Sequence, residues 1–278
     1  MTTARRVLEM ARKGELGAAI SWRLRTWRVT ARERFLRRRL GLSNSLPEAS
    51  PAVVTSGDFG KSAEATRLMA SFESARSGHS RLTPAIRAIE GMSGQSYRTF
   101  INEYVGSTPQ ACYLEVGSWA GSTATAALFG NRVDAVCIDN WSLFGGPREA
   151  FLSNIKLALS EQVTFRFLES DFRAVDFASL GKFNVYLFDG PHEEIDQYDG
   201  VKLAQPALEA KYLLIVDDWN WRAVRNGTFQ ALVDLGCRLE AAVEVRTTRN
   251  DTHADIAWEK SEWHNGYFMA VVVKAQTG

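Results

Sequence analysis

The sequence predicts an α/β protein with a mostly parallel sheet and helices on both of its faces. From residue 112 onward, short runs rich in β-branched and aromatic residues alternate with helical patterns, which is typical of strands joined by crossover helices. A buried strand at 112–117 passes through two glycines into a helix. Two last strands follow one another without a helix between them, which predicts an antiparallel end to the sheet.

The elements follow from local patterns. We expect strands at 112–117, 134–139, 163–169, 183–189, 211–217, 238–247 and 267–274, seven in all, and helices at 121–129, 147–159, 194–208 and 222–235. Helices before this core are expected at 61–76, at 83–90 with Thr83 as N-cap and Pro84 at the first position, and after a Ser93 cap. The chain then divides into a helical arm (1–45), a linker (46–60), a helical cover (61–110) and a Rossmann-like core (111–278).

The arm is strongly basic, although the chain as a whole is nearly neutral. Residues 1–40 hold twelve Lys and Arg against three Glu, a net charge of +9. The rest holds 33 − 12 = 21 basic and 32 − 3 = 29 acidic residues, a net charge of −8. A basic helix with Trp22 and Trp27 can lie on an anionic membrane surface. We favour instead a solvated arm that packs on its own body or on a second subunit, and we expect a homo-oligomer. We expect no nucleic-acid partner, because no recognition motif accompanies the charge.

Cysteine usage and hydropathy indicate a cytoplasmic protein, with peripheral membrane contact through the arm as the alternative. The three cysteines (Cys112, Cys137 and Cys237) are widely spaced and lie in or beside expected strands, so we interpret them as core thiols. No apolar run approaches the roughly 18 residues of a membrane span. The N-terminus lacks the continuous apolar run of a secretory signal.

The glycine turn after the 112–117 strand is the first candidate ligand site. A ligand can approach the backbone closely at Gly117 and Gly121, where no Cβ intervenes. Glu115 would repel a pyrophosphate but suits an ammonium group, and the spacing departs from G-x-G-x-x-G. The pattern Glu115-x-Gly117-x-x-x-Gly121 resembles motif I of the class I S-adenosylmethionine-dependent methyltransferases. With the bulky Trp119, it is most similar to their metal-dependent O-methyltransferase branch, the catechol and macrolide-sugar enzymes.

The resemblance implies S-adenosylmethionine as cofactor and a set of residues that bind it. Asp139, at the tip of the second core strand, would accept the ribose hydroxyls, and Asp171 would contact the adenine amino group with Phe172 beside the ring. A structural carboxylate and a helix-capping Ser-Asp pair are the alternative interpretations. The full expected set is Glu115, Gly117, Ser118, Trp119, Gly121, Ser122, Asp139, Asn140, Trp141, Asp171, Phe172 and Asp189.

Three acidic residues predict a divalent metal site. Asp189 follows the fourth core strand, and Asp217 and Asp218 follow the fifth, which should be its neighbour. Clustered carboxylates repel one another unless a cation lies among them, and oxygen ligands suit Mg²⁺, with Mn²⁺ or Ca²⁺ as substitutes. Turn and cap residues are the alternative interpretation.

His192, three residues after Asp189, is the candidate general base. At the position that corresponds to His192, the catechol enzymes have a lysine base. In having a histidine there, this chain resembles the macrolide-sugar enzymes, whose base is a histidine. Of the other histidines we single out only His264, in the long connection between the last two strands.

We therefore expect a metal-dependent O-methyltransferase with Asp189 and His192 as its catalytic residues. The expected acceptor is a hydroxyl of a sugar, a glycoside, an oligosaccharide or a glycosylated natural product. The alternatives are a catechol or phenol acceptor, a non-catalytic membrane- or complex-associated protein of the same fold, and, more distantly, a nicotinamide-dependent dehydrogenase.

Overall fold

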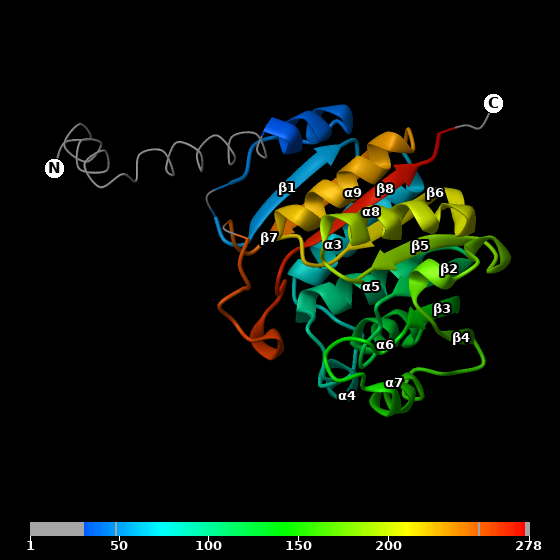
Figure 1. The fold of residues 1–278 in the computed structure, drawn as a ribbon. Coiled ribbons are helices and arrows are strands. Elements are labelled where there is room, and N and C mark those ends of the chain that lie inside the picture. Colours follow the sequence, from blue (N-terminus) through cyan, green and yellow to red (C-terminus); the bar gives the residue numbers. More distant parts are fainter. Residues whose placement is uncertain (1–30, 48, 250, 276–278) are drawn as a thin grey trace, which may run out of the picture.

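Strand order in the sheet is β1-β7-β8-β6-β5-β2-β3-β4 (Figure 1). The computed structural model describes residues 31–47, 49–249 and 251–275, and this order holds within those ranges. The strands are β1 (Ala52–Gly57), β2 (Ala111–Val116), β3 (Val133–Asp139), β4 (Val163–Glu169), β5 (Phe183–Phe188), β6 (Leu208–Val216), β7 (Arg238–Arg246) and β8 (Tyr267–Val273). Residues 31–39 are helical, and the further helices are α3 (Ala63–Arg76), α4 (Pro84–Arg87), α5 (Gln95–Ser107), α6 (Ser122–Leu128), α7 (Arg148–Ile155), α8 (Glu194–Leu203) and α9 (Arg222–Asp234).

The predicted Rossmann-like fold is confirmed, including its antiparallel end. β2 to β6 form parallel pairs, so their carboxyl ends share one edge of the sheet. β8 runs antiparallel to both neighbours, β6 and β7. The connection from β7 to β8 is therefore a return within the sheet rather than a crossover.

Helices cover both faces of the sheet because its strands are apolar on both sides. Along β6, Leu213 and Ile215 belong to one core cluster, while Leu214 and Val216 belong to the other. The first cluster packs against α3, α5, α6 and α7. The second packs against helix 31–39, α8 and α9. A sheet buried on both faces reads in sequence as near-continuous hydrophobic runs, which is the pattern of the core strands.

The segment predicted as a linker contains an eighth strand. β1 pairs antiparallel with β7, from Ala52 opposite Arg246 to Gly57 opposite Ala241. Ala52 and Val54 are buried while their neighbours are more exposed, the alternation of an edge strand. The surrounding Pro and Gly residues obscured this short β-branched run in the sequence.

Most other elements lie within a few residues of their predicted bounds. Thr83 caps α4 as predicted, since its Oγ1 accepts the Ile86 N–H at 3.4 Å. The N-cap of α5 is Gly94 and not Ser93. Ser93 Oγ instead accepts a hydrogen bond from Arg98 Nε at 2.9 Å.

Only the end of the predicted arm is described. Residues 31–39 are helical as expected, and Leu36 and Leu40 are buried in the core. The arm prediction for residues 1–30, including Trp22 and Trp27, lies outside the described residues. Among the helices of the described ranges, none is long and apolar enough to cross a membrane.

Candidate active site

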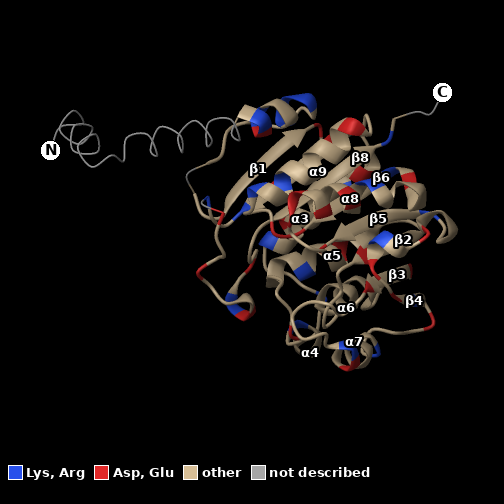
Figure 2. Ribbon diagram, viewed as in Figure 1, with Lys and Arg blue, Asp and Glu red and all other residues tan. Residues whose placement is uncertain are grey.

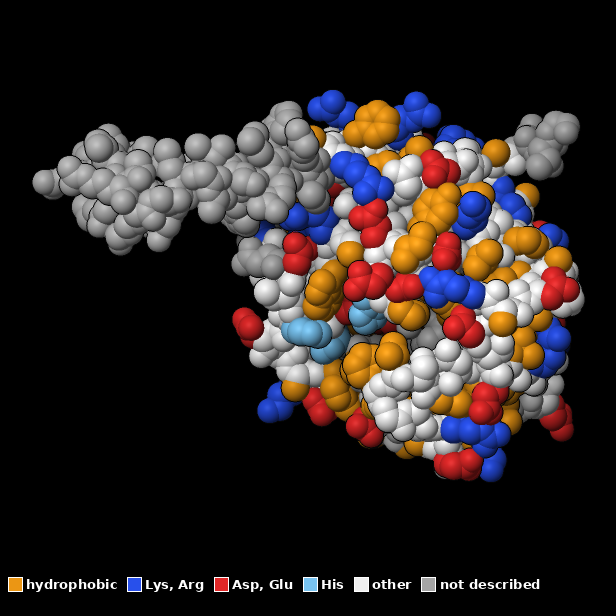
Figure 3. Space-filling model, viewed as in Figure 1, with side chains coloured by type: hydrophobic (Ala, Val, Ile, Leu, Met, Phe, Trp, Pro, Cys, Tyr) orange, Lys and Arg blue, Asp and Glu red, His pale blue; other side chains and the backbone are white. Residues whose placement is uncertain are grey.

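A cavity opens at the carboxyl ends of β2, β3, β5 and β6, the edge where parallel α/β sheets bind ligands. Its walls come from the segments at the ends of β2, β3, β4, β5 and β6, together with Met92, His253 and Asn265. Figure 3 shows histidine and acidic side chains gathered on this face. The lining residues are Met92, Val116, Gly117, Trp119, Ile138, Asp139, Asn140, Ser142, Leu143, Phe144, Ser170, Asp171, Phe172, Asp189, Gly190, Pro191, His192, Asp217, Asp218, His253 and Asn265.

Gly117 allows two strand ends to meet at the cavity floor. Its φ is +85°, and a Cβ at this position would lie 1.9 Å from the Asp189 carbonyl oxygen. The Asp189 N–H in turn donates to the Val116 carbonyl at 2.8 Å. No Cβ fits between β2 and β5 here, so glycine lets the two strand ends pack against each other, and the Gly117 backbone lines the cavity.

Asp139 closes the turns after β2 and β3. Its Oδ2 accepts the N–H groups of Ser118 and Trp119, each at 2.9 Å, and its Oδ1 accepts the N–H of Trp141 at 2.8 Å. A carboxylate offers about four lone-pair sites, so about one remains for a hydroxyl in the cavity. Asp139 therefore fixes the turn geometry and still presents an acceptor to a ligand.

Asp189, Asp217 and Asp218, the predicted metal ligands, all line the cavity. Asp217 Oδ1 accepts the Asp218 N–H at 2.6 Å, and Asn265 Nδ2 donates to Asp218 Oδ1 at 2.9 Å. Ligand atoms of Asp189, His192 and Asp218 lie within 4.8 Å of one another, close enough to share one ion. Asp217 lies beside this group without being part of it. The carboxylate oxygens of Asp189 and Asp218 fit a divalent cation of the Mg²⁺ or Mn²⁺ type.

The electrostatics of the acidic cluster favour a positive charge. Burial, followed by the charges of Asp217 and Asp218, raises the pKa of Asp189 well above its ordinary value. Burial and the charge of Asp218 likewise raise the pKa of Asp217. Carboxylates placed this way remain ionised near neutral pH only when a cation offsets their repulsion.

His192 is held by one of these carboxylates. Its Nε2 lies 2.7 Å from Asp218 Oδ2, and its side chain is 41% exposed toward the cavity. Burial lowers the pKa of His192, but the hydrogen bond to Asp218 and its charge outweigh this, so the pKa lies above its ordinary value. With the Nε2 proton donated to Asp218, Nδ1 is the ring atom free to accept a proton.

Some predicted cofactor residues lie behind the cavity wall. Glu115 is fully buried, with Tyr113 and Thr123 hydroxyls donating to its carboxylate, and burial raises its pKa to about 7. Trp141 packs on Phe151 and Phe167 rather than over the cavity. The expected residues outside the lining are Glu115, Ser118, Gly121, Ser122 and Trp141.

The lining also includes residues that the sequence did not reveal. His253 lines the cavity, whereas His264, which we had singled out, does not. His253 Nδ1 lies 3.4 Å from Asn265 Nδ2, the amide that also contacts Asp218. Both residues come from the long β7–β8 connection, which carries no motif. Leu143 and Phe144, both exposed beside the cavity, likewise follow β3 without a recognisable pattern.

Comparisons with known proteins give distant similarities. No family model matches the chain, and no curated protein matches it. TrmN from Thermus thermophilus is 16% identical with a TM-score of 0.46, covering 69% of this chain and 52% of its own. The O-methyltransferase from Bacillus cereus in complex with SAH is 14% identical with a TM-score of 0.44 (74% and 90% covered). SAH-bound PaMTH1 from Podospora anserina is 15% identical with a TM-score of 0.40 (76% and 88% covered).

The chain spans about half the length of TrmN. Similarity at this level leaves the function to be argued from the geometry of the site.

Proposed function

We propose that the protein is an S-adenosylmethionine-dependent O-methyltransferase that uses a divalent metal ion and acts on a sugar hydroxyl. The observation that carries this proposal is the contact between His192 and Asp218, beside Asp189, in the cavity that Asp139 also lines. The cavity thus unites a candidate base, a candidate cation site and the Asp139 carboxylate as a candidate cofactor contact.

The cofactor would lie along the carboxyl ends of β2, β3 and β4. Asp139 retains an acceptor site for a ribose hydroxyl, and Asp171 and Phe172 line the same cavity beyond it. Gly117 lines the cavity at the point where the end of β2 packs against Asp189. When bound, the cofactor supplies a methyl group already activated by its sulfonium.

The acceptor would lie over the acidic cluster, with its hydroxyl toward His192. Asp189 and Asp218, and Asp217 beside them, would hold the metal ion, which when bound makes a hydroxyl more acidic. Asp218 orients the imidazole, and His192 Nδ1 accepts the hydroxyl proton. Asn265 keeps Asp218 in place through its 2.9 Å hydrogen bond.

The candidate base, His192, is the reason to favour an alcohol over a phenol as the methyl acceptor. An alcohol is far less acidic than a phenol, so its deprotonation benefits from a base and a metal ion acting together. An imidazole of raised pKa, oriented by a carboxylate, suits that demand. A catechol or phenol acceptor is the second candidate function, favoured by the exposed apolar Leu143 and Phe144 beside the cavity, which could contact an aromatic ring.

A cofactor-consumption screen over sugars, glycosides and phenols, with and without EDTA, tests the proposal. We expect turnover of a glycoside hydroxyl that stops in EDTA and returns with Mg²⁺. Turnover of catechols alone would select the second candidate. Failure to bind S-adenosylmethionine in calorimetry would refute both and favour a non-catalytic role.

A further inference from the structure

Helix 31–39 has two unlike faces. Leu36, Arg37 and Leu40 at its end are buried, and Glu33 points inward to Arg225 with a 2.9 Å ion pair. The outer face carries exposed side chains only, namely Arg34, Phe35, Arg38 and Arg39, and the Phe35 residue is 59% exposed. In Figure 2 the helix at the top of the molecule bears basic residues, and in Figure 3 basic side chains flank a hydrophobic one there.

The inward position of Glu33 leaves this outer face without an acidic group. The chain before it adds seven Lys and Arg against two Glu in residues 1–30, together with two tryptophans. A cationic face with an exposed aromatic ring is complementary to a lipid surface that combines negative headgroups with an apolar interior. Nucleic acid offers the charge but no apolar layer for Phe35.

We propose that the outer face of helix 31–39 (Arg34, Phe35, Arg38 and Arg39) docks the protein on an anionic membrane surface. The arginines contact lipid phosphates, and the Phe35 ring enters the headgroup–acyl boundary. The inner face is anchored in the core, so the docking face is fixed relative to the active site rather than tethered to it by a flexible segment.

Vesicle co-sedimentation of the full chain tests this surface. We expect binding to vesicles of phosphatidylcholine with phosphatidylglycerol, weakened by high salt, and little binding to phosphatidylcholine alone. Arg34→Glu/Arg38→Glu/Arg39→Glu should lower the affinity at least tenfold, and Phe35→Ser should lower it at high salt as well. Lys61→Glu/Arg132→Glu/Lys156→Glu is the matched control, since it changes the net charge equally at exposed positions elsewhere.

Three results would overturn the docking proposal. One is equal binding to both kinds of vesicle. Another is an equal loss of binding in the docking-face variant and in the matched control. The third is binding of duplex DNA or self-association of the chain that depends on the docking face while vesicle binding does not.

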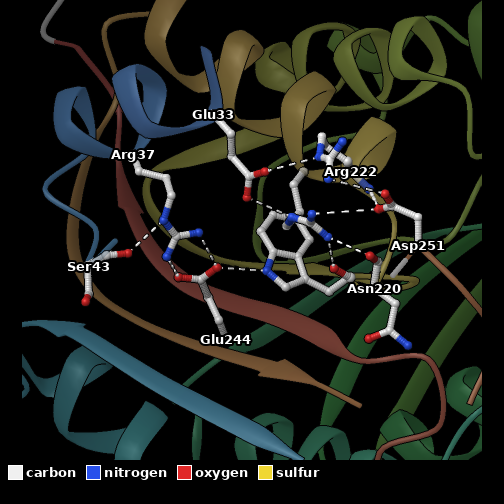
Figure 4. Close-up of polar contacts among 9 residues, drawn as sticks. Glu33, Arg37, Ser43, Asn220, Arg222, Glu244 and Asp251 are labelled. Carbon is white, nitrogen blue, oxygen red and sulfur yellow. Dashed lines mark hydrogen bonds and ion pairs between the residues drawn. The ribbon is translucent and has the colours of Figure 1, made fainter. Parts of the chain in front are cut away.

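The buried side of the same helix carries a second, independent observation (Figure 4). Glu244, buried on β7, accepts hydrogen bonds from Arg37 Nη1 at 2.8 Å and Nη2 at 2.5 Å. The same carboxylate accepts Trp219 Nε1 at 2.9 Å. Trp219 directly follows Asp218, so Glu244 joins the helix to the loop that bears the acidic pair.

Arg225 forms a parallel connection. Its Nη1 donates to the carbonyls of Trp219 and Asn220, each at 2.7 Å, while its Nε pairs with Glu33. Asn220 Oδ1 then accepts the N–H groups of Thr247 and Thr248 at 3.0 and 3.1 Å. The network therefore extends from the helix through the 217–221 loop to the β7–β8 connection, which bears His253.

We infer that Glu244 and Arg225 are positioning residues, which hold the 217–221 loop through helix 31–39. The consequence for catalysis rests on the proposed function, in which Asp217 and Asp218 serve the metal ion. The effect on the stability of the 217–221 loop does not rest on the proposed function, because hydrogen exchange measures it in the protein without any ligand.

Two conservative variants test the inference. Trp219→Phe replaces the indole that stacks on Phe268 at 4.5 Å with a smaller aromatic ring and removes the N–H donor to Glu244. Glu33→Gln removes the charge that faces Arg225, and Glu73→Gln, in the exposed pair with Arg76, is its control. Both test variants should speed amide exchange in 217–221 and 247–253 at least fivefold, with exchange in β2 and β3 unchanged.

In the catalytic assay both variants should lower kcat about tenfold while the KM for the cofactor stays within twofold. Unchanged exchange in the two segments would overturn the inference. Faster exchange in a protein that shows no methyl transfer would leave the positioning role intact and refute only the proposed function.

Discussion

His192 Nε2 and Asp218 Oδ2 are 2.7 Å apart, so the imidazole is oriented by an acidic residue that also belongs to the candidate ion site. Base and cation site are thereby coupled: a change in the position or charge of Asp218 alters both.

The pH dependence of turnover should report His192. Hydrogen bonding to Asp218 outweighs the effect of burial and raises its pKa above the usual value of about 6.5. A general base must be unprotonated, so kcat should rise with pH and level off above the pKa of His192. His192→Ala should lower kcat by about 10²–10³-fold and remove the rise. His253→Ala serves as the control and should retain the pH profile, and loss of the rise in that variant would assign the base to His253.

Asp217→Asn should nearly abolish turnover while leaving the affinity for S-adenosylmethionine within about threefold. The carboxylate lies beside the ion site, and its loss removes charge that favours a cation. Turnover with added Mg²⁺ and calorimetry of cofactor binding measure the two effects separately. Asp255→Asn, at an exposed position, is the matched control. Full activity of Asp217→Asn would show that Asp217 has no part in holding the metal.

Without a metal ion, the protein should become less stable as pH rises. Burial and mutual repulsion raise the pKa of both Asp189 and Asp217 in the folded state. Their protonated forms therefore favour folding, and that contribution is complete below the unfolded pKa of about 3.9 and lost as pH rises through the folded values. Thermal unfolding in EDTA at pH 5 and pH 8 should show this loss.

Added Mg²⁺ should restore the stability, and more so at pH 8 than at pH 5, because binding requires ionised carboxylates. Asp189→Asn should weaken both the pH dependence and the response to Mg²⁺. An equal response to Mg²⁺ at the two pH values would contradict a metal site made of these carboxylates.

Gly117→Ala should destabilise the protein by about 2–4 kcal/mol, since it combines strain with a clash. The new Cβ would lie 1.9 Å from the Asp189 carbonyl oxygen, at φ +85°. Gly130→Ala is the matched control, because φ is +68° but nothing lies within 4 Å. It should cost only about 1 kcal/mol. Urea unfolding measures both, and equal losses would mean that conformational strain, rather than the approach of β5, sets the need for glycine.

The sequence predicted those parts of the fold that depend on local periodicity. Runs such as Leu213 to Val216 are apolar on both faces, so their burial between two helical layers could be expected. The end of each apolar run also marks the end of a strand, and the ends of neighbouring parallel strands lie together. The sequence could therefore predict that Asp189 lies near Asp217 and Asp218. β1 was missed because its pairing with β7 joins segments far apart in the sequence, and no local pattern encodes that pairing.

Side-chain direction limited the prediction of the site. Glu115 lies at the predicted strand end, but the hydroxyls of Tyr113 and Thr123 hold its carboxylate behind the cavity. His253 reaches the cavity through a long connection whose path depends on Asn220 and Asn265. Hydrogen bonds between distant segments decide both outcomes, and a single sequence does not reveal them.

The pairing of β1 with β7 has a consequence for solubility. In its absence, β7 would be the last strand of the sheet, and its free N–H and C=O groups would offer a template to the same strand of another molecule. A chain that begins after Gly57 should therefore tend to aggregate through that open edge, even with every residue of the cavity intact.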